Sequence, residues 1–116
     1  MTELRESDHA LVVELASTLR VISDVNRLRI LSMLMRQELC VCDLIDALGL
    51  RQSLLSHHLG VLRRAGLLQD RREAQWVYYS IIPEKLADLN TQFRQLLDIA
   101  HLGPDAAYGA SPHKCA

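Results

Sequence analysis

Residues 42–64 read CDLIDALGLRQSLLSHHLGVLRR, a stretch that predicts two helices joined by a short turn. In its first part, residues 42–48, apolar residues recur at helical spacing, and Gly49 follows as a residue suited to end a helix. The second helix, which we call the reading helix, begins near Gln52. The leucines expected on its inner side are Leu55, Leu59 and Leu62. Two helices joined by a short turn that contains glycine form the helix-turn-helix pattern.

A β-hairpin is predicted directly after this pair of helices. Gly66 ends the reading helix, and residues 67–72 and 75–81 then read as two strands, the second rich in aromatic and β-branched residues. Glu73-Ala74 lies at the tip and lacks the Asn-Gly or Asp-Gly pair of tight turns, so a longer loop is allowed. Together these elements predict a winged helix-turn-helix, a mainly α fold in which the hairpin is the wing.

Two helices are expected before this unit and one after it. The first has Ser7 or Asp8 as its N-cap, and Asp24 can cap the second. The last helix has Pro83 in its first turn and extends to about His101. The helix that Asp24 caps is predicted to have Leu28, Leu31 and Leu34 or Met35 on its inner stripe, with Ile30 beside it.

The first and last helices carry apolar stripes that a three-helix core cannot fully cover. Because one module of this kind covers few base pairs, such proteins normally dimerise. We therefore expect a homodimer joined through the first and last helices. The residues assigned to this dimer interface are Leu11, Leu15, Leu89, Phe93 and Leu96.

The chain of 116 residues fits one domain, and its 49% apolar content is typical of a globular protein. Residues 1–102 are assigned to the DNA-binding and dimerisation domain. Residues 103–116 contain Gly, Pro, Ser and Ala, and we expect them to form a flexible tail. The N-terminal residues show no signal peptide, and no apolar run is long enough to span a membrane. The sequence therefore predicts a cytoplasmic protein without a membrane partner.

The net charge of −1 conceals an uneven distribution. Residues 51–79 contain five arginines and two acidic residues, so this part has a charge of +3 and the rest of the chain −4. A basic patch on an acidic body favours one orientation against a phosphate backbone. On charge alone, a solvated surface with no ligand explains the pattern equally well.

The outward face of the reading helix carries short hydrogen-bonding side chains that suit base edges in a major groove. Arginines at its end and on the hairpin suit phosphates. The residues assigned to double-stranded operator DNA are Gln52, Ser53, Ser56, His57, Arg63, Arg64, Arg71, Arg72 and Gln75. His58 lies between the two faces of the helix and is interpreted as a half-buried, hydrogen-bonded histidine.

Cys40 and Cys42 stand where an extended piece, residues 38–41, meets the helix that is expected to begin at Cys42. With Cys115 the cysteine count is odd, which favours reduced thiols that bind soft metals or react. Residues two apart in a helix point to nearly opposite sides. One ion with sulfur bonds of about 2.3 Å therefore needs non-helical backbone here, so binding is expected to shift the reading helix. The alternatives are two packed structural cysteines and a disulfide, which is expected to be strained.

Several segments resemble the ArsR/SmtB family of metal-sensing repressors, over roughly residues 10–100. They are DVNRLRIL at 24–31, ELCVCDL at 38–44, SHHL at 56–59, GLL at 66–68 and WVYY at 76–79. The arsenic-responsive branch is the most similar. The resemblance implies a homodimer that represses its own resistance operon and that leaves the operator when As(III) or Sb(III), the inducer, binds the cysteine thiolates.

The arsenic-responsive branch often has a third cysteine three residues after the second, and Ile45 occupies that position here. Trivalent arsenic prefers three sulfur ligands, so Cys115 is the candidate third ligand, with a small-molecule thiol or hydroxide as alternatives. Cadmium- and lead-sensing relatives share the Cys-Val-Cys string, so another soft metal such as cadmium or lead stays open as the inducer.

The sequence offers three alternatives to a metalloid sensor. A thiol-based redox or reactive-sulfur sensing repressor would pair Cys40 or Cys42 with Cys115. A protein-binding winged helix without an operator is disfavoured by the arginines of the hairpin. A thiol oxidoreductase is disfavoured because the sequence has no Cys-x-x-Cys, no Ser/His/Asp arrangement and no Gly-rich phosphate loop, so we expect no enzyme.

Overall fold

The computed structural model describes residues 6–102, which form five α-helices, three strands and a final 3-10 turn. The helices are α1 (Glu6–Ile22), α2 (Val25–Leu34), α3 (Val41–Leu48), α4 (Gln52–Arg64) and α5 (Pro83–Leu97). The strands are β1 (Leu39–Cys40), β2 (Leu68–Glu73) and β3 (Trp76–Ile81), and the 3-10 turn is η1 (Ile99–His101).

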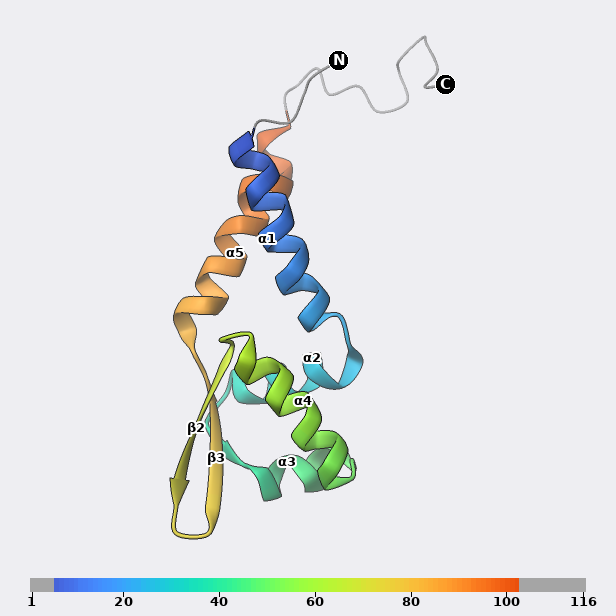
Figure 1. Ribbon diagram of the computed structural model, residues 1–116, viewed down its shortest axis with the longest axis vertical. Helices are drawn as coiled ribbons and strands as arrows, with labels where there is room; N and C mark the ends of the chain where they lie inside the picture. Colours follow the sequence, from blue (N-terminus) through green and yellow to red (C-terminus); the bar gives the residue numbers. More distant parts are fainter. Residues whose placement is uncertain (1–5, 103–116) are drawn as a thin grey trace.

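These elements form an elongated molecule with two different ends (Figure 1). Helices α1 and α5 pack against each other at one end, whereas α3, α4 and the hairpin of β2 and β3 form the other end (Figure 1). The predicted winged helix-turn-helix is confirmed: α3 and α4 are its two helices, α4 is the reading helix, and the β2–β3 hairpin is the wing.

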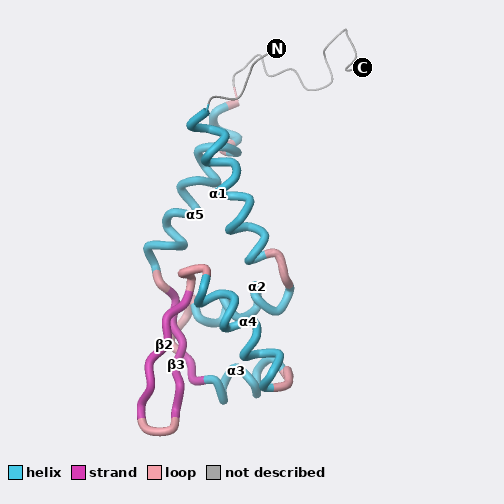
Figure 2. The backbone as a smooth tube through the Cα atoms, in the orientation of Figure 1, coloured by secondary structure: helices cyan, strands magenta, loops and turns pink. Residues whose placement is uncertain are grey.

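The sheet has three antiparallel strands in the order β1-β3-β2 (Figure 2). Strands β2 and β3 pair continuously from Leu68 opposite Ile81 to Glu73 opposite Trp76. Only Ala74 and Gln75 are left for the turn, so the longer loop that the sequence allowed does not form. The predicted tip, Glu73-Ala74, is wrong by one residue, because Glu73 pairs with Trp76 as the last residue of β2. The turn closes because Ala74 adopts a left-handed backbone with φ of 56°.

The core lies between α2, α3, α4 and the start of β2. Its fully buried side chains are Ile30, Leu44, Leu55, Leu59, Leu62, Leu67 and Leu68. Each such side chain contributes about 2 kcal/mol by leaving water. In α2 the inner stripe is Ile30, Leu31 and Leu34, and the expectation that Leu28 or Met35 belongs to it is wrong, because both are exposed.

Most of the predicted helix ends are confirmed. The Asp24 carboxylate caps α2 by accepting hydrogen bonds from the backbone N–H groups of Asn26 and Arg27, at 2.9 and 3.1 Å. Gly49 follows α3 in a left-handed conformation, with φ of 67°. Pro83 begins α5, where its missing N–H costs no hydrogen bond.

Three boundaries differ from the predictions. Helix α1 already includes Glu6, ahead of the proposed caps Ser7 and Asp8. Helix α3 begins one residue early, at Val41, because Cys40 is its N-cap. Helix α5 ends at Leu97 instead of near His101, because Asp98 is extended and its carboxylate caps η1 through the N–H of Ala100.

The expected flexible tail, residues 103–116 with Cys115, lies outside the described residues. Within residues 6–102, no helix combines the length and the apolar character needed to cross a membrane.

Candidate functional site

The outer face of α4 is polar and open to solvent. Leu55, Leu59 and Leu62 are buried, which orients the opposite side of the helix outward. All of the helix residues assigned to DNA are exposed: Gln52, Ser53, Ser56, His57, Arg63 and Arg64. A helix with such a face can enter a major groove and offer hydrogen bonds to base edges.

His58, which follows this face, points inward. It is buried, and its Nδ1 accepts a hydrogen bond from Nε of Arg27 at 3.2 Å. Arg27 also donates from Nη1 to the carbonyl oxygen of Val21, 2.8 Å away. The pair links the reading helix to α2 and the end of α1, which confirms His58 as a structural, hydrogen-bonded histidine.

A hollow of about 600 Å³ separates α4 from the wing. Ser56 and Arg63 of α4 and Arg72 and Gln75 of the wing line it, together with Cys42 from the start of α3. The structure thus brings predicted DNA contacts from two elements to the same hollow, with one of the two thiol positions beside them. Tyr79 lies on its wall, and burial raises the pKa of the Tyr79 phenol, which keeps this side chain neutral.

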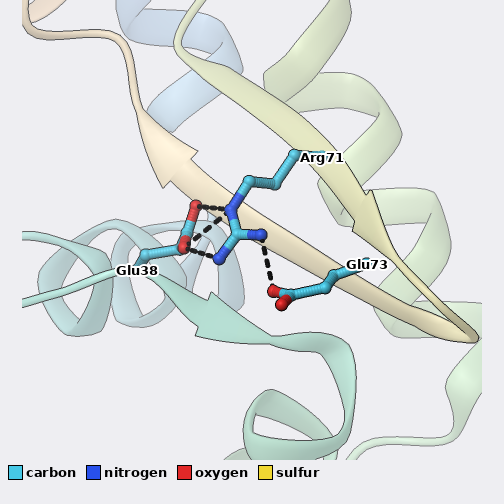
Figure 3. A network of polar contacts seen from close by, with 3 residues as sticks. All are labelled: Glu38, Arg71 and Glu73. Atoms are coloured by element: carbon cyan, nitrogen blue, oxygen red, sulfur yellow. Dashed lines mark hydrogen bonds and ion pairs between the residues drawn. The ribbon is translucent and has the colours of Figure 1, made fainter.

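Two of the arginines assigned to phosphates already have carboxylate partners. Arg63 lies 3.4 Å from Asp70 of β2. Arg71 is bound by Glu38 and Glu73, as Figure 3 shows. The Arg71 hydrogen bond lowers the pKa of the Glu38 carboxyl, and the two carboxylates raise the pKa of the Arg71 guanidinium. The sequence analysis assigned Arg71 to DNA without anticipating these partners.

Cys40 and Cys42 are brought together by the way α3 begins. Cys40 is the N-cap and is extended (φ −78°, ψ 159°), whereas Cys42 lies in the first turn of the helix. The Cys40 Sγ accepts a hydrogen bond from the Asp43 N–H at 3.3 Å. Cys40 is 6% exposed and Cys42 is half-buried.

The two sulfurs are joined as a disulfide, with the Cα atoms 5.3 Å apart. The sequence left such a bond open and predicted that it would be strained. The Cα separation lies within the usual range for a disulfide because Cys40 stands outside the helix instead of two positions along it. The extended backbone at Cys40 is also the non-helical geometry that two sulfurs need to bind one ion, once the disulfide has been reduced to two thiols.

Asp43 completes a cluster that the sequence analysis missed. Ligand atoms of Cys40, Cys42 and Asp43 all lie within 4.8 Å of one another, so a single metal ion can reach all three after the disulfide is reduced. A signal for it exists in the sequence, because Asp43 is three residues after the N-cap. An acidic side chain at that position often turns back toward the cap. Thiolates select soft ions, and a carboxylate adds one hard donor.

The residues assigned to the dimer interface differ in their exposure. Leu15 is buried within the chain, and Leu11, Leu89 and Leu96 are half-buried. Phe93 is 44% exposed. Other exposed apolar residues on the same two helices are Val12, Val13, Leu19 and Leu97. The packed α1–α5 pair therefore still presents apolar surface, with Phe93 as its largest side chain.

Comparison with known proteins adds independent evidence. Residues 24–70 match the model of the family described as "Bacterial regulatory protein, arsR family". The chain is 41% identical over 90 residues to the arsenic resistance transcriptional regulator ArsR1 of Pseudomonas putida, covering 75% of this chain and 70% of that protein. It is 45% identical over 65 residues to the arsenical resistance operon repressor of Escherichia coli, covering 55% and 56% respectively.

The fold agrees with that of solved structures. NolR from Sinorhizobium fredii superimposes with a TM-score of 0.67 at 32% sequence identity, covering 84% of this chain and 97% of that one. The matched region includes the helix-turn-helix and extends well beyond the segment that the family model covers.

Proposed function

The chain belongs to the ArsR family of bacterial regulatory proteins, and from this premise we propose that it represses a metalloid-resistance operon until As(III) or Sb(III) binds Cys40 and Cys42. Membership makes it a DNA-binding transcriptional regulator and not an enzyme. Since members of the family bind operator DNA as dimers, we assign it a homodimer that acts on double-stranded DNA in the cytoplasm.

The observation that supports a thiophilic signal is the position of the two sulfurs. They lie at the first turn of α3, the helix that packs against α4 within the helix-turn-helix, and Cys42 also lines the hollow between α4 and the wing. A ligand on these sulfurs is therefore adjacent to residues assigned to DNA. The names of the relatives in Pseudomonas putida and Escherichia coli support arsenic among the soft elements.

The third donor to the ion is assigned to Asp43, with Cys115 as the alternative. Asp43 is within reach of both sulfurs, whereas Cys115 lies outside the described residues. A site with two sulfurs and one oxygen holds trivalent arsenic less firmly than three sulfurs would. It also leaves cadmium and lead as candidate inducers.

Release from DNA requires the inducer to bind the DNA-free form more tightly than the DNA-bound form. A hundredfold loss of operator affinity corresponds to about 2.7 kcal/mol of coupling, which lies within the range of known allosteric proteins. By reciprocity, operator DNA must weaken inducer binding by the same factor.

The test is operator binding measured by fluorescence anisotropy with arsenite, antimonite, cadmium or zinc present. Arsenite and antimonite are expected to release the wild type and to leave Cys40→Ser and Cys42→Ser bound. Serine is the proper replacement at Cys40 because its hydroxyl can still accept the Asp43 N–H, so α3 keeps its cap. Asp43→Asn is expected to need about tenfold more arsenite, and Cys115→Ser is expected to behave as the wild type. Release of both serine variants by arsenite would reject the proposal.

A second candidate signal is oxidation, which the disulfide between Cys40 and Cys42 favours. In that reaction two thiols give up two electrons and two protons to an oxidant such as hydrogen peroxide, which is reduced to water. The sequence analysis paired one of these cysteines with Cys115 instead. Mass spectrometry after mild peroxide, with operator binding measured in parallel, distinguishes a 40–42 bond from either bond to Cys115.

A further inference from the structure

Arg71, on the wing, is enclosed by acidic and aromatic side chains. Its Nε lies 3.0 Å from both carboxylate oxygens of Glu38, and its Nη2 lies 2.7 Å from Oε1 of the same residue. Its Nη1 donates to Glu73 at 2.9 Å. The guanidinium also lies over the Tyr78 ring, 4.5 Å from the centroid. All three nitrogens of the guanidinium are therefore engaged within the protein.

Glu38 and Glu73 differ in what they connect. Glu73 lies on β2 with Arg71, so this contact moves with the wing (Figure 3). Glu38 directly precedes β1, whose second residue is Cys40. Across the sheet, Cys40 is opposite Tyr78, and Tyr78 is opposite Arg71. The Glu38–Arg71 pair thus ties the segment that carries the thiol to the outer strand of the wing.

This arrangement conflicts with a simple role for Arg71 as a phosphate contact. One guanidinium with two carboxylates presents a net charge of −1, which repels DNA. Yet the pair lies at the surface, since the side chain of Arg71 is 50% exposed and that of Glu38 is 33% exposed. Exposed ion pairs are weak and exchange readily. A phosphate offers the same forked acceptor geometry as a carboxylate.

We propose that Glu38 occupies the phosphate-binding position of Arg71 in the DNA-free protein and that an operator phosphate displaces it when the wing binds. This inference rests on the proposed function only in that the chain binds DNA. Glu38 is then a residue that sets the affinity of the wing. Because Glu38 and Cys40 lie on one short segment, the exchange also links the thiol site to the wing: whatever strengthens the Glu38–Arg71 contact weakens DNA binding.

The test compares Glu38→Gln with the wild type on a duplex of about 30 base pairs from the chain's own promoter and on a random duplex of equal length. The variant is expected to bind both about two- to fivefold more tightly per wing, because Arg71 no longer has to leave a carboxylate. The slope of affinity against salt is expected to stay the same, because Arg71 contacts one operator phosphate in both complexes.

Two control variants distinguish this exchange from a general effect of removing one negative charge. Asp46→Asn removes one exposed negative charge from α3, at a side chain that contacts no basic group within residues 6–102, and is expected to change affinity by less than half as much. In an Arg71→Ala background, Glu38→Gln is expected to have no effect on affinity or on the salt slope.

Each result decides the matter. Unchanged or weaker DNA binding by Glu38→Gln would overturn the inference and make the pair a structural link. An equal gain in the Arg71→Ala background would also overturn it, because simple loss of charge would then explain the effect. If the wild type binds neither duplex, both the proposed function and this inference are rejected.

Discussion

At the scale of single residues, Cys40 combines two functions in one atom. Its sulfur is the acceptor that caps α3, and it is also half of the pair assigned to the inducer. A thiolate is a stronger hydrogen-bond acceptor than a thiol, and the positive end of the helix dipole favours it. The position that caps the helix is therefore also one of the two positions assigned to the inducer.

Asp24 provides a residue-scale prediction about acid stability. The backbone hydrogen bond from Arg27 lowers the pKa of the Asp24 carboxyl below its ordinary value of 3.8. A lowered pKa means that this cap stabilises the fold above that ordinary value and is lost as the pH falls through the folded-state pKa. We expect Asp24→Asn, which keeps an oxygen acceptor, to lose less stability than the wild type between pH 5 and pH 3.

Thermal unfolding followed by circular dichroism at several pH values measures this difference. Asp24→Ala serves as the control: without an acceptor it is expected to melt about 5 °C lower than the wild type at pH 7. If Asp24→Asn and the wild type have parallel pH profiles, the cap is not the group that titrates.

At the scale of elements, the turn of the wing is less stable than it needs to be. Ala74 has a φ of 56°, a region in which a side chain costs about 1 kcal/mol and glycine costs nothing. We expect Ala74→Gly to raise the melting temperature by about 2 °C after the added entropy of the unfolded chain is counted. Ala74→Val, with a branched side chain, is expected to lower it. A lower melting temperature for the glycine variant would show that this turn is not strained.

The sequence predicted best those features of elements that depend on near neighbours. Asp24, Gly49 and Pro83 act through the backbone within a few residues, so their positions at helix ends could be recognised directly. The exposed face of α4 could be predicted because the leucines on its other side have strict helical spacing. In α2 the same reasoning placed Leu28 inside and left Leu34 and Met35 as alternatives, because a stripe of leucines does not show which of its edges the neighbouring helices cover.

The candidate site was predicted less completely because its contacts join distant segments. Glu38 and Arg71 are 33 residues apart and meet only because β1 pairs with β3 in one register. The nearness of Cys40 and Cys42 depends on the backbone at the start of α3, where Cys40 is the extended N-cap and Cys42 lies in the first turn. Register and helix starts within one or two residues are set by tertiary packing, which local patterns describe poorly.

At the scale of the whole molecule, α1 and α5 carry the surface assigned to a second copy. Phe93 and Leu97 on α5 are 44% and 61% exposed, so a charge there disturbs the chain's own core little. Leu89, by contrast, packs against that core, and its replacement would confuse folding with assembly. We expect Phe93→Asp to give a folded monomer that binds operator DNA at least a hundredfold more weakly.

Analytical ultracentrifugation and circular dichroism measure assembly and folding separately. The matched control is Gln95→Asp, which adds the same charge two residues along α5, on another side of the helix, and is expected to remain a dimer. A Phe93→Asp protein that sediments as a dimer would move the interface to another surface.

The elements assigned to DNA and inducer binding lie at one end of the molecule, and those assigned to subunit association lie at the other. This separation affects how repression would be restored. The cysteine pair lies with α3, α4 and the wing, at the opposite end from the paired α1 and α5 (Figure 1). A regulator built this way can dissociate from its promoter while it remains a dimer. Once the inducer has dissociated, the intact dimer can bind the promoter again without first having to reassemble from two subunits.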